Sequence, residues 1–312
     1  MLGIGLYGDN GHQIQNLLIN HPKAELIAIS NFRAKCPVPG ITEYAGLDDM
    51  LKDDRIKLIS LCSPMRSDQA KDAVKCMQAG KHVYAEKPCA LTEGDLDMII
   101  MTAKETGMSF HEMADTTFME PYISMREIVK SGSLGEIIQV FAQKSYPYHD
   151  RRPQDEITDG GLTRQAGIHA IRFIEHVTGI KIKEISCFET SLGNPVSGGG
   201  LKMASSIMMK LSNGGVASAV VNYLNQPGFP TWGNENLRIF GLKGFVEATD
   251  GGTKTRLVIG DKDHGPIKTR ENIKPFFDML VDSLISGGEM PLSMEDELHP
   301  TRMVIRANAI YP

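Results

Sequence analysis

The sequence predicts an α/β protein, with a parallel-sheet domain first and an α+β domain with a large, mostly antiparallel open sheet second. Three observations lead to this prediction. In the first third of the chain, short apolar runs alternate with helical patterns, which is typical of βαβ units. After residue 121, longer strands and hairpin turns replace this alternation. The 312 residues suffice for two domains, which we expect at 1–121 and 122–312.

Composition and charge exclude several classes of partner. The chain has a formal net charge of -5 and no long run of either charge sign. Nucleic-acid and membrane-surface proteins need a basic face, so we expect neither partner. No apolar run is long enough to span a bilayer, and no signal-peptide pattern precedes the first strand. The five scattered cysteines predict free thiols in a reducing, cytoplasmic compartment, and no residue spacing predicts a metal site.

The elements of the first domain follow from apolar runs and from signals at their ends. A first strand is expected over residues 2–8, and a helical pattern over residues 14–18 follows the turn after it. Thr92 is expected to cap a helix with its hydroxyl, and Gly80 to end another. Further strands are expected at 24–29, 56–61, 82–85 and 108–112, with helices at 47–52, 68–79 and 92–105.

The second domain is expected to contain a strongly two-sided sheet. Residues 203–211 and 216–223 predict a hairpin whose strands carry small or apolar residues on both faces. One face can pack on helices, while the other would be an exposed apolar patch, so we expect a homodimer or homotetramer through this open sheet. A sheet covered by its own chain is the alternative. Other strands are expected from 137, 182, 237 and 244, with helices at 122–130, 162–177, 275–286 and 294–309.

A strand that runs into a charged pair and a proline is the central feature of the first domain. Residues 82–85 lead directly into Glu86, Lys87 and Pro88. Burying charge is costly unless the charge is paired or used, and the carboxyl ends of parallel strands are where ligands bind. This arrangement predicts an ammonium group held at a binding edge. A salt-bridged surface lysine is the alternative.

The turn after the first strand is a candidate dinucleotide site. Gly8 fits the first glycine of the Rossmann-type fingerprint, Asn10 stands at the second and Gln13 at the third. Asparagine tolerates positive φ, so the turn can present backbone N–H groups and a helix N-terminus to a pyrophosphate. A turn that binds nothing would look similar.

The end of the second strand bears on the choice between NAD and NADP. Asn31 and Arg33 stand where an acidic residue normally binds the adenine ribose. No carboxylate repels a 2′-phosphate there, and Arg33 could pair with one, which favours NADP. Arg33 pointing into solvent is the alternative. The cofactor-binding residues that we expect are Gly8, Asn10, Gly11, His12, Asn31, Arg33, Cys62, Ser63, Pro64, Glu86 and Lys87.

The order of the motifs resembles one family along almost the whole chain, from about Ile4 to Ala309. Gln165 and His169 are four apart on a predicted helix and so share a face. With them, the chain resembles the family of glucose-fructose oxidoreductase, inositol dehydrogenase and their relatives. The motifs that carry the resemblance are Gly80-Lys81-His82-Val83, Glu86-Lys87-Pro88, Ser131-Gly132-Ser133-Leu134-Gly135-Glu136-Ile137, Gly167-Ile168-His169 and Gly241-Leu242-Lys243-Gly244.

The resemblance implies an NAD(P)-dependent dehydrogenase or reductase that acts on a CH–OH group of a sugar, cyclitol or related molecule. It places the nicotinamide near Lys87 and the substrate between the domains, with Lys87 and His169 handling the hydroxyl proton. Gln165 stands where the family has an aspartate; it can hydrogen-bond a hydroxyl but cannot accept its proton. Two alternatives stay open: a lyase or glycosidase that oxidises a sugar transiently, or a catalytically weakened cofactor-binding sensor.

Substrate recognition is expected from the loop before the Gly160-Gly161 pair and from the helix after it. Arginines there could meet a carboxylate or phosphate of the substrate. A solvated loop is the alternative. The candidates are Tyr148, Arg151, Arg152 and Arg164.

Overall fold

The computed structural model describes residues 1–33 and 40–309, which form two compact units. The first unit combines Met1–Met113, Ile157–Gly160 and Phe276–Arg302. The second combines Ala114–Glu156, Gly161–Pro275 and the chain from Met303. The units are thus built from segments that alternate along the sequence, whereas the expected division at residue 121 separates two continuous segments and stays a prediction.

A parallel sheet forms the centre of the first unit. Its strand order is β3-β2-β1-β4-β5-β6, with all neighbours parallel, as in doubly wound dinucleotide-binding folds. All residues of β1 and β4 are buried, because both faces of such a sheet are covered. The strands are β1 (Leu2–Tyr7), β2 (Ala24–Ser30), β3 (Thr42–Tyr44), β4 (Leu58–Leu61), β5 (His82–Glu86) and β6 (Phe110–Met113). The parallel sheet is confirmed; the short strand β3 was not expected.

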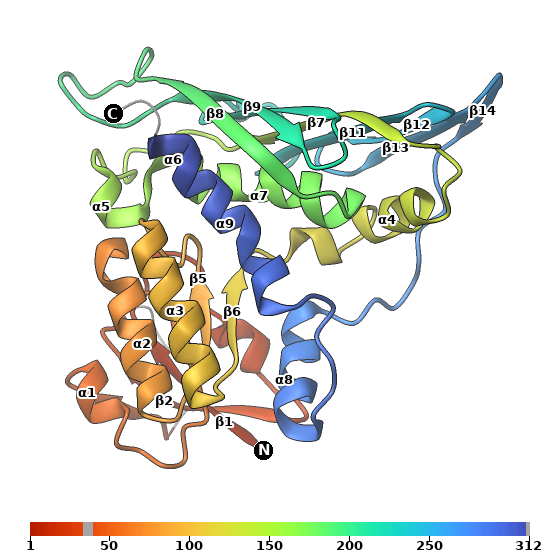
Figure 1. Ribbon diagram of the computed structural model, residues 1–312. Helices are drawn as coiled ribbons and strands as arrows, with labels where there is room; N and C mark the ends of the chain where they lie inside the picture. Colours follow the sequence, from red (N-terminus) through yellow and green to blue (C-terminus); the bar gives the residue numbers. More distant parts are fainter. Residues whose placement is uncertain (34–39, 310–312) are drawn as a thin grey trace. The chain divides into compact units, whose positions relative to one another are not determined.

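The helices of the first unit confirm most of the predicted signals. Thr92 accepts the backbone N–H of Asp95 at 3.1 Å, and Gly107 ends the same helix with a left-handed φ of 69°. In Figure 1, α2 and α3 lie side by side. The elements are η1 (Gln15–Leu18), α1 (Leu47–Met50), η2 (Arg66–Asp68), α2 (Gln69–Gln78), α3 (Glu93–Thr106), α8 (Phe276–Ser286) and the start of α9 (Met294–Ala309).

The sequence predicted an α-helix after the first strand, and the structure corrects this prediction. The described chain forms only the four-residue 3₁₀ helix η1 there, and Leu17 of the expected apolar stripe is exposed. Asn20 then turns the chain with φ 55°, and β2 begins at Ala24. A single 3₁₀ turn has little macrodipole, so a helix dipole contributes little to this turn, and its binding of a diphosphate stays a prediction.

An eight-stranded sheet dominates the second unit. Its order is β14-β13-β12-β11-β7-β10-β9-β8, and only the β7–β10 pair is parallel. The mostly antiparallel sheet and the 203–223 hairpin are therefore confirmed. The strands are β7 (Ile137–Ser145), β8 (Ile182–Thr190), β9 (Ala204–Leu211), β10 (Val216–Asn222), β11 (Asn234–Gly241), β12 (Gly244–Thr249), β13 (Lys254–Ile259) and β14 (Lys262–Gly265).

Helices cover one face of this second sheet. Ile207 and Met209 point into the core on that face, while Met208 between them is exposed on the other. Figure 1 shows α4, α6 and α7 along the covered face. The remaining elements are η3 (Thr116–Phe118), α4 (Tyr122–Lys130), α5 (Glu156–Asp159), α6 (Gly161–Gln165), α7 (Gly167–Arg172) and the π-helical η4 (Phe173–Val177).

The helix expected over residues 162–177 is interrupted. It ends at Gln165, restarts at Gly167 and widens into a π-helix after Arg172. Gln165 and His169 therefore lie on two successive short helices, and the argument that they share one helix face does not hold.

Candidate functional site

Lys87 lies directly after β5 and is buried. Its side chain and that of Glu86 are each 1% exposed, and Lys87 Nζ lies 3.5 Å from Glu86 Oε1. Within the described residues, Nζ has no hydrogen-bond partner at shorter range. The Lys87–Pro88 peptide bond is cis. The amine is thus held by one ion pair and keeps its donor and acceptor capacity for a ligand.

The environment of Lys87 favours its neutral form. Loss of solvation lowers the pKa of Lys87, and the charge of Arg66 lowers it further, while Glu86 and Asp159 oppose these effects. Burial alone would raise the pKa of Glu86, but Lys87, His12 and Arg66 hold it below its ordinary value. The pair therefore combines a carboxylate that stays ionised with an amine that gives up its proton more readily than an exposed lysine.

The turn after β1 leaves no room for side chains at its glycines. Gly8 has φ +72°, and a Cβ there would lie 1.9 Å from the carbonyl oxygen of Cys62. Gly11 has φ +129°, and its Cβ would lie 2.7 Å from Cγ of Glu86. The turn is thus packed against the ends of β4 and β5, the neighbouring strands at the same sheet edge.

Glu86 ties the turn to the lysine. Its carboxylate accepts the backbone N–H of His12 at 3.1 Å and lies 3.1 Å from Nδ1 of the same residue. The Cys62 thiol donates to the His12 carbonyl oxygen at 2.7 Å. Burial raises the pKa of the Cys62 thiol well above its ordinary value, so this cysteine is a structural contact and not a nucleophile.

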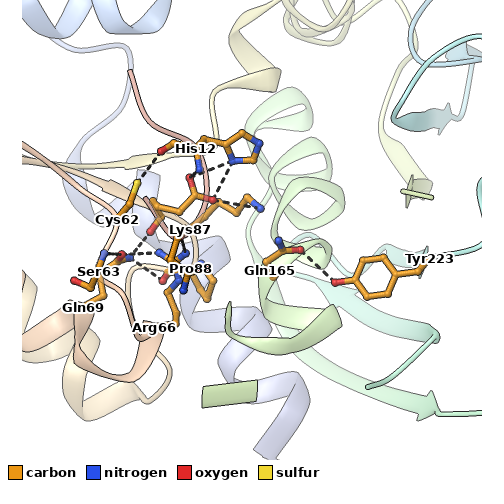
Figure 2. A network of polar contacts seen from close by, with 11 residues as sticks. His12, Cys62, Ser63, Arg66, Gln69, Lys87, Pro88, Gln165 and Tyr223 are labelled. Carbon is orange, nitrogen blue, oxygen red and sulfur yellow. Dashed lines mark hydrogen bonds and ion pairs between the residues drawn. The ribbon is translucent and has the colours of Figure 1, made fainter. Parts of the chain in front are cut away.

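Two buried residues that the sequence did not single out support the same edge. Arg66 Nη1 donates to Gln69 Oε1 at 2.5 Å, and Nη2 donates to the carbonyl oxygen of Asn10 at 2.5 Å. Gln69 donates to the carbonyl oxygens of Glu86 and Pro88 (Figure 2). These contacts link the dinucleotide turn to the Glu86–Pro88 stretch and place a positive charge beneath the turn.

Side chains occupy the two positions where the fingerprint has glycines. Asn10 donates to the carbonyl oxygens of Pro64 and Thr158, at 3.0 and 2.6 Å. Gln13 donates to the carbonyl oxygen of Gly8 at 2.7 Å and accepts from Ser60 Oγ at 2.7 Å. Amide groups thus close the turn where glycines would leave it open.

The residues after β2 and β4 lie where the sequence predicted. Asn31 has φ 49° and donates to Tyr7 Oη at 3.3 Å. Arg33 is exposed, and its backbone N–H donates to Asp9 at 2.8 Å. The Ser63 hydroxyl, after β4, donates to Asp72 at 2.8 Å. Residues 34–39, including Cys36, lie outside the described residues. The cofactor-binding role of all these residues stays a prediction.

The predicted groups of the second unit meet around Tyr223. The Tyr223 hydroxyl donates to Gln165 Oε1 at 3.3 Å (Figure 2). His169 is buried with its ring 6.4 Å from the ring of Tyr146. Lys87 belongs to the first unit and His169 to the second, so their joint action on one proton stays a prediction.

The substrate candidates separate into different environments. Arg151 is exposed, and Arg164 pairs with Glu156 at 2.7 Å. Tyr148 is half-buried against the core of the second unit, and Arg152 is buried. Among the predicted arginines, Arg152 lies close to Tyr223, whose ring centroid is 3.6 Å from the guanidinium carbon.

The Gly160-Gly161 pair has a packing explanation. A Cβ on Gly160 would lie 2.6 Å from Cγ of Pro88, and a Cβ on Gly161 would lie 2.7 Å from Cγ of Glu156. Asp159, the residue before the pair, is the second carboxylate that raises the pKa of Lys87. The sequence marks this segment by its two adjacent glycines, but the contact with Pro88 depends on the fold.

The fit of the first unit to a dinucleotide rests on its own residues. Gly8 lets the turn after β1 lie close to the backbone of Cys62. The buried Lys87 amine lies at the same edge of the sheet. Among the described residues, no group of three or more His, Cys, Asp or Glu is arranged to hold a metal ion. In the same part of the chain, no helix is long and apolar enough to cross a membrane.

Comparison with family profiles matches both halves of the chain. A profile described as "Oxidoreductase family, NAD-binding Rossmann fold" matches residues 1–113. A profile described as "GFO/IDH/MocA C-terminal domain" matches residues 122–247. The first match covers the six strands that carry the Gly8 turn and Lys87.

Individual relatives are distant. A trans-1,2-dihydrobenzene-1,2-diol dehydrogenase of Bos taurus is 27% identical over 157 residues, which cover 50% of this chain and 46% of that protein. A myo-inositol 2-dehydrogenase of Thermotoga maritima is 21% identical over 223 residues, 70% of this chain and 64% of that protein. The match thus spans less than two thirds of these curated relatives. A solved oxidoreductase structure from Thermotoga maritima has a TM-score of 0.85 at 23% identity, covering 99% of this chain and 97% of that chain, and shares the fold.

Proposed function

Since the chain belongs to the Gfo/Idh/MocA family of oxidoreductases, we propose that it transfers a hydride between NAD(P) and a hydroxyl-bearing carbon of a sugar, cyclitol or related small molecule. The observation that carries this proposal is the buried Lys87 amine at the carboxyl end of β5. A base that accepts a hydroxyl proton must lose its own proton near the working pH, and burial shifts the pKa of Lys87 downward, in the direction that this role needs.

The residues of the first unit have distinct roles in this proposal. The bound nicotinamide supplies or accepts the hydride. Gly8, Gly11 and His12 hold its diphosphate, with the charge of Arg66 beneath the turn in place of a helix dipole. Lys87 accepts the hydroxyl proton, and Glu86 fixes its position through His12.

The second unit contributes the substrate side. Gln165 cannot take a proton, but it can orient a hydroxyl through its amide, and the Tyr223 hydroxyl fixes that amide. His169 is the second proton carrier in this scheme, because one nitrogen of a neutral imidazole donates a hydrogen bond while the other accepts one. The sensor alternative follows if Lys87 alone cannot compensate for the missing carboxylate.

We also propose NADP as the preferred cofactor, because Asn31 and Arg33 present no carboxylate after β2. Two features extend the proposal to the whole protein. The four described cysteines are free and buried, which suits a reducing cytoplasm. The exposed apolar face of the second sheet suits a homodimer or homotetramer.

Binding and turnover measured separately test this function. We expect NADPH to bind the wild type more tightly than NADH by fluorescence titration, and Arg33→Ala to reduce the difference. We expect reduction of the oxidised cofactor with a panel of hexoses and inositols, and a loss of roughly 10²- to 10⁴-fold in kcat for Lys87→Met with the cofactor still bound. Binding without turnover of any polyol would contradict the enzyme and support the sensor.

A further inference from the structure

We infer that Arg152 binds an oxyanion group on the substrate, so that the protein acts on sugar acids or sugar phosphates in preference to neutral sugars. This inference rests on the proposed function, since it names the substrate class of the same site. It starts from the burial of the guanidinium and the contacts that this group lacks.

Arg152 is a buried cation without a carboxylate partner. Arg152 is 7% exposed, and within the described residues its guanidinium forms no ion pair. Its one hydrogen bond runs from Nη2 to the carbonyl oxygen of Pro147 at 3.3 Å, and its Nε is buried without a partner. An arginine can donate five hydrogen bonds, and leaving a buried charge uncompensated costs several kcal/mol.

Lys144 provides an internal comparison. Both cations face the ring of Tyr146, with Lys144 Nζ 4.6 Å and the Arg152 guanidinium carbon 5.9 Å from its centroid. Lys144 is paired with Glu235. The unit therefore provides a carboxylate for Lys144 and leaves Arg152 to the aromatic rings. A cation–π contact compensates the charge only in part, because the ring face offers no carboxylate oxygen to the guanidinium N–H groups.

The position of Arg152 connects it with the predicted chemistry. Its guanidinium stacks on the Tyr223 ring, with the guanidinium carbon 3.6 Å from the centroid. The hydroxyl at the other end of that ring donates to Gln165. The cation and the glutamine are thus one tyrosine apart, and Gln165 is half-buried, so part of its side chain stays exposed.

The chemistry of the guanidinium defines the ligand. Stacking fixes the plane of the guanidinium, and its planar fork donates two parallel hydrogen bonds to a carboxylate or phosphate. A neutral hydroxyl would leave the charge uncompensated. A hexose whose C6 carries a carboxylate or phosphate keeps its ring hydroxyls for Gln165 and provides the missing charge.

Matched pairs of sugars test the inference. D-glucuronate, D-galacturonate and D-glucose 6-phosphate are compared with their neutral hexoses, by cofactor reduction and by the rise in unfolding temperature that each sugar causes without cofactor. We expect a kcat/KM at least tenfold higher for one anionic class, and the two anionic arms distinguish carboxylate from phosphate. In Arg152→Met we expect this advantage to fall roughly 10- to 100-fold, mainly through KM.

Controls separate charge from packing. Arg152→Lys keeps the charge and should restore part of the anion preference, while Arg256→Met, at an exposed arginine of the same unit, should leave the preference unchanged. A folded Arg152→Met variant with an unchanged ratio would overturn the inference. If that variant does not fold, the wild type decides: equal stabilisation by glucuronate, glucose 6-phosphate and glucose overturns it.

The same data keep the two proposals apart. Turnover of neutral polyols without anion preference would overturn the role of Arg152 and leave the dehydrogenase proposal standing. Arg152-dependent stabilisation by glucuronate or glucose 6-phosphate without any cofactor reduction would support Arg152 as the anion site and contradict the dehydrogenase.

Discussion

Glu86 is the residue that controls the charge of Lys87 most directly among its charged neighbours. Its carboxylate lies 3.5 Å from Nζ and opposes the loss of solvation that lowers the pKa of Lys87. Replacing Glu86 by glutamine removes the negative charge that raises the pKa of Lys87, while the volume of the side chain stays nearly the same. The lysine should then lose its proton at a lower pH.

The first prediction concerns Glu86→Gln. Because Lys87 must be neutral to accept a hydroxyl proton, the acid limb of kcat/KM for hydroxyl oxidation should move to lower pH by roughly one unit. The pH profile of the initial rate measures it. Glu112→Gln, at another buried glutamate of the first unit, should leave the limb in place. A limb that stays or moves to higher pH in Glu86→Gln would contradict Lys87 as the base.

A second prediction uses the same pKa for stability. The folded pKa of Lys87 lies below its ordinary value of 10.5, so the unfolded chain binds more protons between these two values. This lysine therefore makes the free energy of unfolding rise with pH over that window. In Lys87→Met the rise should be smaller. Urea unfolding from pH 7 to pH 10 measures the difference from the wild type, and parallel curves for both proteins would refute the lowered pKa.

For single residues, the sequence predicts a site residue that directly follows a strand. It misses charged neighbours that the fold brings in from distant parts of the chain. Lys87 could be found because a buried strand, a charged pair and a proline are consecutive. Arg66 and Asp159 lie 21 and 72 positions from it in the printed sequence, and no local pattern marks either as its neighbour. Their effect on Lys87 needs the fold.

At the scale of elements, the turn after β1 depends on one glycine. Gly8 and Gly80 have the same φ, +72°, but only Gly8 lies against another backbone. A Cβ on Gly8 would lie 1.9 Å from the Cys62 carbonyl oxygen, whereas nothing lies within 4 Å of a Cβ on Gly80. The two positions therefore separate the cost of a left-handed φ from the cost of a clash.

The third prediction compares Gly8→Ala with Gly80→Ala. The control should lose about 1 kcal/mol of unfolding free energy, from the left-handed φ alone. Gly8→Ala should lose at least about 2 kcal/mol more, because the backbone must shift, and nucleotide binding should weaken with it. Urea unfolding and fluorescence titration measure the two effects. Equal losses in both variants would show that the turn accommodates the methyl group.

The short helix η1 shows the limit of pattern reading for elements. Residues 14–18 carry an apolar pattern that suits an α-helix, but only 15 residues lie between Gly8 and the start of β2 at Ala24. Asn20 with its positive φ uses part of that length. The apolar pattern correctly predicts that Leu18 is buried, but it does not predict how long the helix is.

For the whole molecule, the sequence predicts two sheets and misses how the chain alternates between the units. The Glu297 carboxylate of α9 contacts two residues of β6. Its Oε2 lies 2.7 Å from His111 Nδ1, and its Oε1 accepts the backbone N–H of Glu112 at 2.9 Å. Thr301 donates to Glu112 at 2.7 Å. These buried contacts join the end of the chain to the first unit. A reading in chain order assigns that helix to the second domain, because no local signal marks such distant partners.

The exposed face of the second sheet leads to the last prediction. Along β8, β9 and β10 it carries Phe188, Met208 and Val216, and the half-buried Phe240 and Phe245 continue it on β11 and β12. Large exposed apolar side chains on one face of a sheet suit a contact with another molecule. A second copy can bury the same residues on both chains across a two-fold axis.

Met208→Asp should therefore convert the protein to a single chain in solution. The new carboxylate would have to be buried opposite its own copy, where desolvation and repulsion both oppose association. Met101 on α3 is exposed to a similar extent, 54% against 59%, so Met101→Asp is a matched control that should keep the wild-type mass. Light scattering after size-exclusion chromatography measures the mass of each variant. A wild type with the mass of one chain, or a Met208→Asp variant with the wild-type oligomeric mass, would assign the apolar face to another partner.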